Sequence, residues 1–437
     1  MNLIGIDIGT TTISAAVLDS DSRQVIESRT ISNNSFISST FPWERIQNVS
    51  IIIEKAAAVL DQLLTLYPDI SSIGLTGQMH GIVYIGENGQ AVSPLYTWQD
   101  GRSNQPVTEN QNAVEIIKSV TGLTISSGYG LATHYYNIRH GLVPEGSTSI
   151  CTIADYLGMV LTGRKTPLVH ISNAASLGLF DSQHGCFYSE QIQELHMNPC
   201  ILPEVTSEFA LLGAYKGIPV AVAIGDNQAS FLGSAGMEES TILLNMGTGG
   251  QISVFSTQYF EAPGIECRPL TKDRYLLVGA SLCGGRAYAI VERFFRSYLS
   301  AAGMEEQSQY QIMEVLARKG RKSERPWSVT TTFSGTRQDP EQCGSICGIT
   351  EDNFTPENLI YGTLKGMAQE LYDMYQIIYD GTGIRPLKLI GSGNGLRRNK
   401  VLQEIFKELF QAEFTLSECE EEAASGAALS SLYGIAG

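Results

Sequence analysis

Positive charge is scarce in this sequence. Its 437 residues include 29 lysines and arginines against 45 aspartates and glutamates, which gives a formal net charge of −16. Nucleic acid and anionic membrane surfaces repel such a chain, so neither is expected as a partner. A ligand that carries phosphate would have to be held by backbone amides, helix N-termini or a metal ion rather than by a basic surface.

Long apolar runs and clustered cysteines are also missing. No segment is long and apolar enough to cross a membrane, and no secretory signal precedes the first expected strand, residues 3–8. The 8 cysteines stand singly, and the closest two, Cys343 and Cys347, have no second pair to complete a zinc site. We therefore expect reduced thiols and a cytoplasmic protein.

The length and the order of the patterns predict two α/β domains, because a single core stops growing at roughly 250–300 residues. Residues 122–180 are interpreted as an insert of helices and loops, and the domain boundary is placed near 218–226. A helix of small residues at the end of the chain is suited to packing on a sheet. The helices are expected at 44–66, 285–300, 305–319, 356–379 and 421–434, and further strands at 72–77, 81–85, 218–224, 274–282 and 386–390.

The same hairpin pattern occurs twice. Residues 3–18, "LIGIDIGTTTISAAVL", and 241–255, "TILLNMGTGGQISVF", each contain an apolar strand, a polar residue two before a glycine, Gly-Thr and a second strand. Each is interpreted as a tight β-hairpin whose glycine allows a positive φ and leaves the turn amides unobstructed. Two copies about half the chain apart suggest duplicated domains that face each other, with the phosphates of a nucleotide between the turns.

Asp7 stands in the middle of the first apolar strand, and a buried carboxylate is costly without a partner. Mg²⁺, bound directly or through water, would compensate it, because hard cations prefer carboxylate oxygens. A neighbouring lysine or a backbone turn is the alternative partner.

A glycine-rich segment, "GSGNGL" at 391–396, follows an expected strand and precedes a helix whose apolar residues repeat at helical spacing. It lacks the last glycine of a dinucleotide fingerprint, and the sequence contains no P-loop motif. Small residues at such a turn would let the backbone approach adenine and ribose, although a purely structural strand-to-helix turn is the alternative.

Together these segments resemble the FGGY family of carbohydrate kinases, and the resemblance covers essentially the whole chain. Within the family, "GQMHG" points to the xylulokinase branch and its relatives. The segments "TWQDGR", "GYGLAT" and "NAAS" are most similar to sedoheptulokinases. The motifs, in chain order, are "GIDIGTTT" (5–12), "GLTGQMHG" (74–81), "TWQDGR" (97–102), "LTG" (161–163), "NAASLGLFD" (173–181), "GDNQAS" (225–230), "NMGTGG" (245–250), "GSGNGLRRN" (391–399) and "GAAL" (426–429).

The resemblance implies two ribonuclease H-like (actin-like ATPase) domains with a central cleft between them. Residues 1–224 would form the sugar-binding N-terminal domain with the first phosphate hairpin, and 225–437 the nucleotide-binding C-terminal domain. The implied reaction transfers the γ-phosphate of ATP to a terminal hydroxyl of a ketose. Sedoheptulose, giving sedoheptulose 7-phosphate, is favoured, with xylulose or another sugar of the family as the alternative. Closure of the cleft would exclude water and limit ATP hydrolysis.

Asp226, in "GDNQAS", is the expected catalytic base. It follows a buried strand where a helix should begin, so capping of that helix is the alternative role. The resemblance favours the base, which would accept the proton of the sugar hydroxyl and orient it toward the γ-phosphate.

Sugar contacts are expected from residues of the first domain and from Asn227. The Met79–His80 pair corresponds to sugar-contacting residues of xylulokinases, although His80 alone would more often be structural. Trp98 can stack on a sugar and Asp100 can accept from two hydroxyls. Arg102 would hold Asp100 in place or reach a substrate oxygen, or lie on a surface loop. The full predicted set is Gln78, Met79, His80, Trp98, Asp100, Arg102 and Asn227.

The nucleotide side and the partners complete the expectation. The cofactors are ATP and Mg²⁺, with Asp7 as the metal-binding residue. A sugar and ATP are the expected small-molecule partners, and a homodimer is left open. Residues carried over for the nucleotide are Asp7, Thr10, Thr11, Thr12, Gly247, Thr248, Gly285, Gly391, Gly393 and Asn394.

Two other classes of protein are alternatives to a kinase. An actin-like sensor that binds without transferring phosphate should have lost the base, yet Asp226 and Asp7 are both present. An ATPase of the heat-shock chaperone type would need a peptide-binding domain after the ATPase, for which the 437 residues leave no room.

Overall fold

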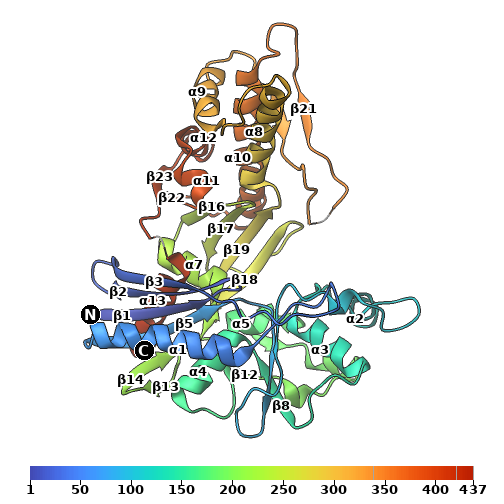
Figure 1. The fold of residues 1–437 in the computed structure, drawn as a ribbon, viewed down its shortest axis with the longest axis vertical. Coiled ribbons are helices and arrows are strands. Elements are labelled where there is room, and N and C mark those ends of the chain that lie inside the picture. Colours follow the sequence, from blue (N-terminus) through green and yellow to red (C-terminus); the bar gives the residue numbers. More distant parts are fainter. Residues whose placement is uncertain (338, 420, 437) are drawn as a thin grey trace. The chain divides into compact units, whose positions relative to one another are not determined.

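The chain folds into two compact units, in a computed structural model that describes residues 1–337, 339–419 and 421–436 (Figure 1). Unit 1 comprises Met1–Gly236, Arg268–Asp273 and Cys419–Gly437, and unit 2 comprises Met237–Cys267 and Arg274–Glu418. The predicted division after residue 224 falls just before α7 (Asp226–Ala235), which the contacts group with unit 1.

A mixed sheet forms the centre of unit 1. Strand β5 runs parallel to β1, β14 and β15, whereas β1 and β2 form an antiparallel hairpin. The strands follow the order β13 (Leu211–Tyr215), β14 (Ile218–Ala221), β5 (Ile70–Gly77), β1 (Asn2–Ile8), β2 (Thr12–Asp19) and β3 (Val25–Ser32), with β15 (Ile224–Gly225) also paired to β5.

Short ladders and helices complete unit 1. The ladders join β4 (Ile46–Gln47) to β7 (Leu95–Tyr96), β6 (Val83–Gly86) to β8 (Ser147–Cys151), β9 (Leu168–His170) to β12 (Glu204–Thr206) and β10 (Phe180–Asp181) to β11 (Cys186–Phe187). The other helices are α1 (Val49–Leu66), α2 (Ala113–Thr121), α3 (Gly130–Arg139), α4 (Ile153–Thr162), α5 (Ile171–Ser176), α6 (Ser189–Glu194) and α13 (Glu422–Ala436).

Helix α1 begins later than the predicted residue 44. The side chain of Asn48 accepts from the backbone N–H of Ile51 and caps the helix, so the helix starts at Val49. Ile46 and Gln47 are extended instead, because they pair with β7. The predicted start is wrong by the length of this short strand.

The last helix, α13, packs on the sheet of unit 1 against β1 and β5 (Figure 1). The fit is close: a Cβ added to Gly5 or Gly74 would lie 1.7 Å from a carbonyl oxygen of α13, of Ala424 or Ala427 respectively. The predicted packing of a small-residue helix on a sheet is confirmed, and glycines in the strands make it possible.

Alternation along β1 separates its two faces. Ile4, Ile6 and Ile8 belong to the main core of unit 1, which also contains the buried residues of α1. Leu3 packs instead with Ala428 and Leu429 of α13. Asp7 shares the face of Leu3 and Gly5, so the unusual carboxylate of this strand lies on the α13 side.

Unit 2 contains a second mixed sheet. Its hairpin β16–β17 and the parallel strand β22 repeat the arrangement of β1, β2 and β5. The order is β18 (Ile265–Thr271, grouped with unit 1 from Arg268 onward), β19 (Arg274–Ser281), β17 (Gly250–Ser256), β16 (Thr241–Met246), β22 (Lys388–Ser392) and β23 (Glu413–Leu416). The remaining elements are α8 (Gly284–Ala301), α9 (Tyr310–Gly320), β20 (Ser328–Thr330), β21 (Ser345–Cys347), α10 (Pro356–Thr382), α11 (Asn394–Arg397) and α12 (Lys400–Phe410).

Candidate active site

Both predicted hairpins are present. Ile8 lies opposite Ile13, with residues 9–12 as the first turn, and Met246 lies opposite Gly250, with 247–249 as the second. Neither Gly9 nor Gly247 has a positive φ, so the turns do not use that freedom of glycine. Glycine at position 9 is needed for space instead, because an added Cβ would lie 3.0 Å from the carbonyl oxygen of Thr12.

The polar residue before each turn has matching neighbours. Asp7 lies between Ser14 on the hairpin partner and Thr76 on β5. Asn245 lies between Gln251 and Ser392 in the same way, and its Nδ2 donates to Ser392 Oγ at 2.8 Å. The internal duplication predicted from the sequence therefore extends to the strand that flanks each hairpin.

Asp226 follows the end of β15, where Gly225 lies opposite Gly77 of β5. The N-cap of α7 is Gly225, and the Asp226 carboxylate accepts from the backbone N–H of Asn227 rather than capping the helix. Because Asp7 stands near the end of β1 on the other side of β5, the two carboxylates lie at the carboxyl ends of the two parallel strands that flank β5. Capping thus does not account for Asp226.

The two carboxylates influence each other. Burial, followed by repulsion from Asp226 and from Glu421, raises the pKa of Asp7 to about 7. Burial also raises the pKa of Asp226, against the opposing effects of Arg268 and the Asn227 N–H. Glu421 and Arg268 were missed in the sequence, because neither lies in a motif and both are distant along the chain. Among the described residues no group of three or more histidines, cysteines, aspartates and glutamates could hold a metal ion.

Met79 and His80 follow the carboxyl end of β5, the strand between Asp7 and Asp226. A Cβ added to Gly225 would lie 2.6 Å from Met79 Cε, which places the thioether against the residue before Asp226. His80 has a φ of 70°, its Nδ1 donates to the carbonyl oxygen of Ser176 at 2.8 Å, and its ring stacks on Tyr129 at 4.3 Å. A left-handed backbone at a bulky residue costs energy and is typical of functional sites.

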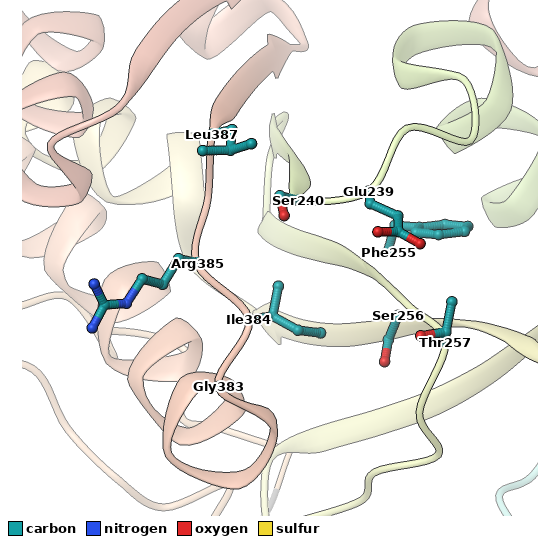
Figure 2. Close-up of a pocket in the computed structure, with 9 residues that line it drawn as sticks. All are labelled: Glu239, Ser240, Phe255, Ser256, Thr257, Gly383, Ile384, Arg385 and Leu387. Atoms are coloured by element: carbon teal, nitrogen blue, oxygen red, sulfur yellow. The ribbon is translucent and has the colours of Figure 1, made fainter.

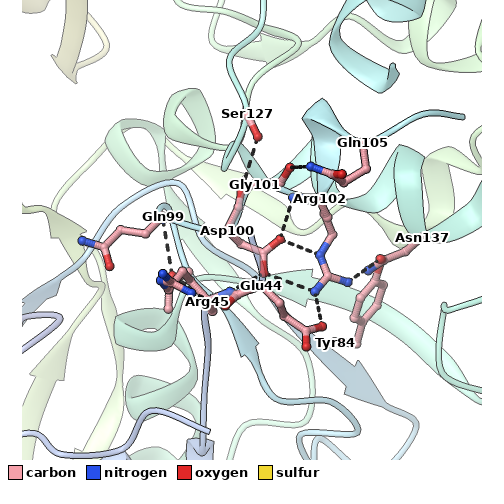
Figure 3. A network of polar contacts seen from close by, with 11 residues as sticks. Glu44, Arg45, Tyr84, Gln99, Asp100, Gly101, Arg102, Gln105, Ser127 and Asn137 are labelled. Carbon is pink, nitrogen blue, oxygen red and sulfur yellow. Dashed lines mark hydrogen bonds and ion pairs between the residues drawn. The ribbon is translucent and has the colours of Figure 1, made fainter. Parts of the chain in front are cut away.

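Asp100 and Arg102 form a buried ion pair (Figure 3). Arg102 Nε donates to Asp100 Oδ1 at 2.7 Å and Nη2 to Oδ2 at 3.2 Å, while Nη1 donates to Asn137 Oδ1 at 2.9 Å. Asp100 also accepts from the backbone N–H of Arg45. Arg102 is only 2% exposed, so the surface-loop interpretation is wrong, and it holds Asp100 in place.

Trp98 and Gln78 meet the first hairpin turn. Trp98 Nε1 donates to Thr10 Oγ1 at 3.0 Å, and Thr10 Oγ1 donates to Gln78 Oε1 at 3.4 Å. Thr11 and Thr12 are exposed on the same turn. The structure thus connects residues predicted for the sugar with one predicted for phosphate. Asn227, next to Asp226, has a buried Oδ1 for which no partner is found among the described residues.

The predicted nucleotide residues of unit 2 gather where β16 and β22 end. The backbone N–H of Gly285, in the first turn of α8, donates to the carbonyl oxygen of Gly247 at 2.9 Å, and that of Arg286 to Thr248 at 3.0 Å. Gly393 has a φ of 81°, and a Cβ added there would lie 2.6 Å from the carbonyl oxygen of Met246. Gly391 is the fourth residue of β22, and Asn394 begins α11.

A separate pocket of about 340 Å³ lies at the other end of this sheet (Figure 2). Its lining includes Ser240 before β16, Ser256 at the end of β17 and Leu387 before β22. The strand register therefore separates it from the hairpin turn, and no predicted site residue lines it.

Sequence comparison identifies the two halves. The N-terminal domain of the FGGY family of carbohydrate kinases matches residues 2–233, and its C-terminal domain matches residues 242–435. The chain belongs to the FGGY family of carbohydrate kinases. Membership of this family makes the protein a carbohydrate kinase, which implies the use of ATP and a sugar.

Named relatives and solved structures agree with this assignment. The kinase is 27% identical to sedoheptulokinases from Mus musculus and Homo sapiens, over 98% of this chain and 96% of each relative. The structure of a xylulose kinase from Rhodospirillum rubrum matches with a TM-score of 0.84 and 22% identity, over 100% of this chain and 90% of that one. The fold is thus the two-domain α/β fold that was predicted. No helix in the described part of the chain is long and apolar enough to cross a membrane.

Proposed function

We propose that this kinase transfers the γ-phosphate of ATP to a terminal hydroxyl of a ketose, with sedoheptulose as the first candidate and xylulose as the second. The product from sedoheptulose would be sedoheptulose 7-phosphate. The observation that carries the proposal is the placement of Asp226 and Asp7 at the ends of the two strands that flank β5 in unit 1. The named sedoheptulokinases, similar over nearly their whole length, support the choice of sugar.

Asp226 is the proposed base. Its carboxylate accepts from the Asn227 N–H and is opposed in charge by Arg268, which keeps it oriented and favours its ionised form. In phosphoryl transfer such a group accepts the hydroxyl proton and aligns the nucleophile, and the transition state needs little else from a base.

Asp7 is the proposed metal-binding residue. It lies in a partly buried position beside two other carboxylates, where a cation would relieve their repulsion. Mg²⁺ is usually held by one or two carboxylates together with phosphate oxygens and water, which fits the absence of a larger ligand cluster in the described residues. When bound, Mg²⁺ would neutralise charge on the transferred phosphate.

Each hairpin turn is proposed as a phosphate-binding element of its own unit, through its backbone amides and hydroxyls. In unit 1 these belong to Thr10, Thr11 and Thr12. In unit 2, Gly247 and Thr248 are exposed, and Gly285 supports the turn from behind. Adenine and ribose would lie against the glycine-rich segment at Gly391, Gly393 and Asn394, where small residues permit close approach.

The sugar is proposed to contact unit 1. Trp98 is 47% exposed and offers a face for stacking, and His80 offers a polar ring. Gln78 is 4% exposed with its amide bonded to Gln47 and Thr10, so it would act by holding Thr10 in place. Met79 provides an apolar surface beside Gly225, and Asn227 has a buried amide oxygen without a partner among the described residues. Asp100 and Arg102 would act mainly by positioning the sugar-contacting residues, because their polar groups already form hydrogen bonds with each other. A cytoplasmic location and a homodimer stay predictions.

A panel of sugars tests the proposal. ADP release should be measured with sedoheptulose, xylulose, ribulose, fructose and glycerol, and kcat/KM compared. Turnover with sedoheptulose or xylulose well above the ATPase background is expected. A non-catalytic sensor would bind a sugar without any turnover, and that outcome would remove the proposed transfer.

A further inference from the structure

A closed ring of hydrogen bonds lies beneath the first hairpin turn. Gln47 Nε2 donates to the backbone carbonyl of Thr10 at 2.8 Å, and Gln78 Nε2 donates to Gln47 Oε1 at 2.9 Å. Thr10 Oγ1 closes the ring by donating to Gln78 Oε1 at 3.4 Å, its longest link. Gln47 is 0% exposed and Gln78 is 4% exposed, so water cannot replace these contacts readily.

The carbonyl of Thr10 fixes the direction of the whole ring. A carbonyl oxygen only accepts, so Gln47 must present its amide nitrogen to it. The amide oxygen of Gln47 then faces Gln78, which must donate in turn, and the amide oxygen of Gln78 is left for the Thr10 hydroxyl. Gln47, which no motif indicated, therefore sets how the single proton of that hydroxyl is used.

Trp98, a proposed sugar contact, is hydrogen-bonded to this ring. Its Nε1 donates to Thr10 Oγ1, so the hydroxyl accepts from the indole while it donates to Gln78. Gln47 also lies opposite Leu95 in the β4–β7 ladder, which ends just before Thr97 and Trp98. The indole is half exposed and Thr10 is partly buried, whereas Gln47 and Gln78 are buried.

We propose that Gln47 is a positioning residue that couples sugar binding at Trp98 to phosphate binding at the Thr10 turn. The inference rests on the proposed function, because it takes Trp98 as a sugar contact and the turn as a phosphate contact. A sugar that holds the indole in one orientation also holds the Thr10 hydroxyl, to which the indole donates. Through Gln78 and Gln47 the same hydrogen bonds then hold the Thr10 carbonyl in place. The nucleotide then binds to a turn that is already ordered, so each ligand increases the affinity for the other.

Asn33 offers a matched control. Its Nδ2 donates to the carbonyl of Gly9, the neighbouring residue of the same turn, at 2.8 Å, and it is also 0% exposed. Within the described part of the chain, the hydrogen bonds of Asn33 join it to Gly9, Thr11, Ser35 and Lys55, and none joins it to Gln78 or Trp98. Loss of Asn33 should therefore disturb the anchoring of the turn without cutting the connection to Trp98.

The test measures the affinity for MgADP by calorimetry, with and without saturating sedoheptulose, in the full-length protein. In the wild type we expect sedoheptulose to tighten MgADP binding by about fivefold or more. In Gln47→Leu and in Trp98→Phe that factor should fall below about twofold, while Asn33→Leu keeps it even if its affinity for MgADP alone is weaker.

Three results would overturn the inference: no effect of sedoheptulose in the wild type, an unchanged factor in Gln47→Leu, or an equal loss in Asn33→Leu. If Gln47→Leu does not fold, Trp98→Phe decides, because it removes the indole N–H at a half-exposed position. Coupling is measured by binding and the proposed function by transfer, so either can fail while the other holds.

Discussion

Asp7 and Asp226 lie at neighbouring strand ends of unit 1 with β5 between them. Asp7 is opposite Thr76 of β5, and Gly225, which precedes Asp226, is opposite Gly77. Together with burial, this proximity raises the pKa of Asp7. The position of Asp7 therefore explains why an apolar strand contains an aspartate: it brings this carboxylate close to that of Asp226. In the proposed function, a cation and a phosphate would bind there.

Asp226→Asn should abolish transfer while largely sparing nucleotide binding. The amide keeps the shape of the side chain but cannot accept the hydroxyl proton, so we expect kcat to fall by about 10²- to 10⁴-fold. The affinity for MgADP, measured by calorimetry, should stay within about threefold, because the change removes no turn amide. Asp61→Asn is the control, since Asp61 lies on α1 and accepts hydrogen bonds from Tyr215 and Lys216. Wild-type turnover in Asp226→Asn would end its role as base.

Asp7→Asn should raise the Mg²⁺ requirement. An amide oxygen binds Mg²⁺ more weakly than a carboxylate, so the Mg²⁺ concentration for half-maximal rate should rise by about tenfold or more at fixed ATP. Removal of Mg²⁺ by EDTA should stop transfer in both proteins. The control is Asp69→Asn, an exposed aspartate that accepts from Asn2. The same Mg²⁺ dependence in all three proteins would show that Asp7 does not bind the metal.

The sequence predicted features that depend on neighbouring residues. Both hairpins, the strand before Asp226 and the helix after the glycine-rich segment follow from apolar periodicity and turn residues. The close packing of α13 on a sheet also follows from its small residues. These patterns are local, so a single sequence carries them.

Contacts between distant segments could not be predicted in this way. Glu421 and Arg268 influence Asp7 and Asp226 from segments far along the chain, and neither stands in a motif. Gln47 was placed inside a predicted helix, although it belongs to a strand of two residues whose partner is β7. Tertiary pairing overrode the helical periodicity there, and the same pairing put Gln47 beneath the turn.

Gly285→Ala should weaken ATP binding. An added Cβ would lie 2.4 Å from the carbonyl oxygen of Gly247, so α8 and the turn must move apart. We expect unit 2 to lose about 1–3 kcal/mol of stability and the KM for ATP to rise, with the affinity for sugar alone unchanged. Gly303→Asn is the matched control, because a Cβ there meets nothing within 4 Å and asparagine tolerates its φ of 76°. An unchanged KM for ATP in Gly285→Ala would contradict the assigned contact.

Arg102→Lys should destabilise unit 1. Lysine keeps the charge but cannot reach Asp100, Asn137 and Glu44 together, and a buried carboxylate would lose its partner. We expect a loss of about 3 kcal/mol in urea unfolding and a higher KM for the sugar. The comparison is Arg29→Lys, whose partly exposed ion pair with Glu27 should contribute less than about 1 kcal/mol. Equal losses in the two variants would mean that the buried network carries no special stability.

His134 makes stability depend on acid pH. Its ring is buried, its Nδ1 forms a hydrogen bond of 2.8 Å with Tyr84 Oη, and burial lowers the pKa of His134 to about 4. Between about pH 6.5 and 4 the unfolded chain binds a proton at His134 that the folded chain does not, so this contribution to stability is complete above pH 6.5 and is lost as the pH falls. His134→Gln cannot bind that proton. We therefore expect the variant to lose about 2 kcal/mol less than the wild type between pH 7.5 and 5 in urea unfolding. Parallel losses in both proteins would mean that His134 does not remain neutral in the folded chain.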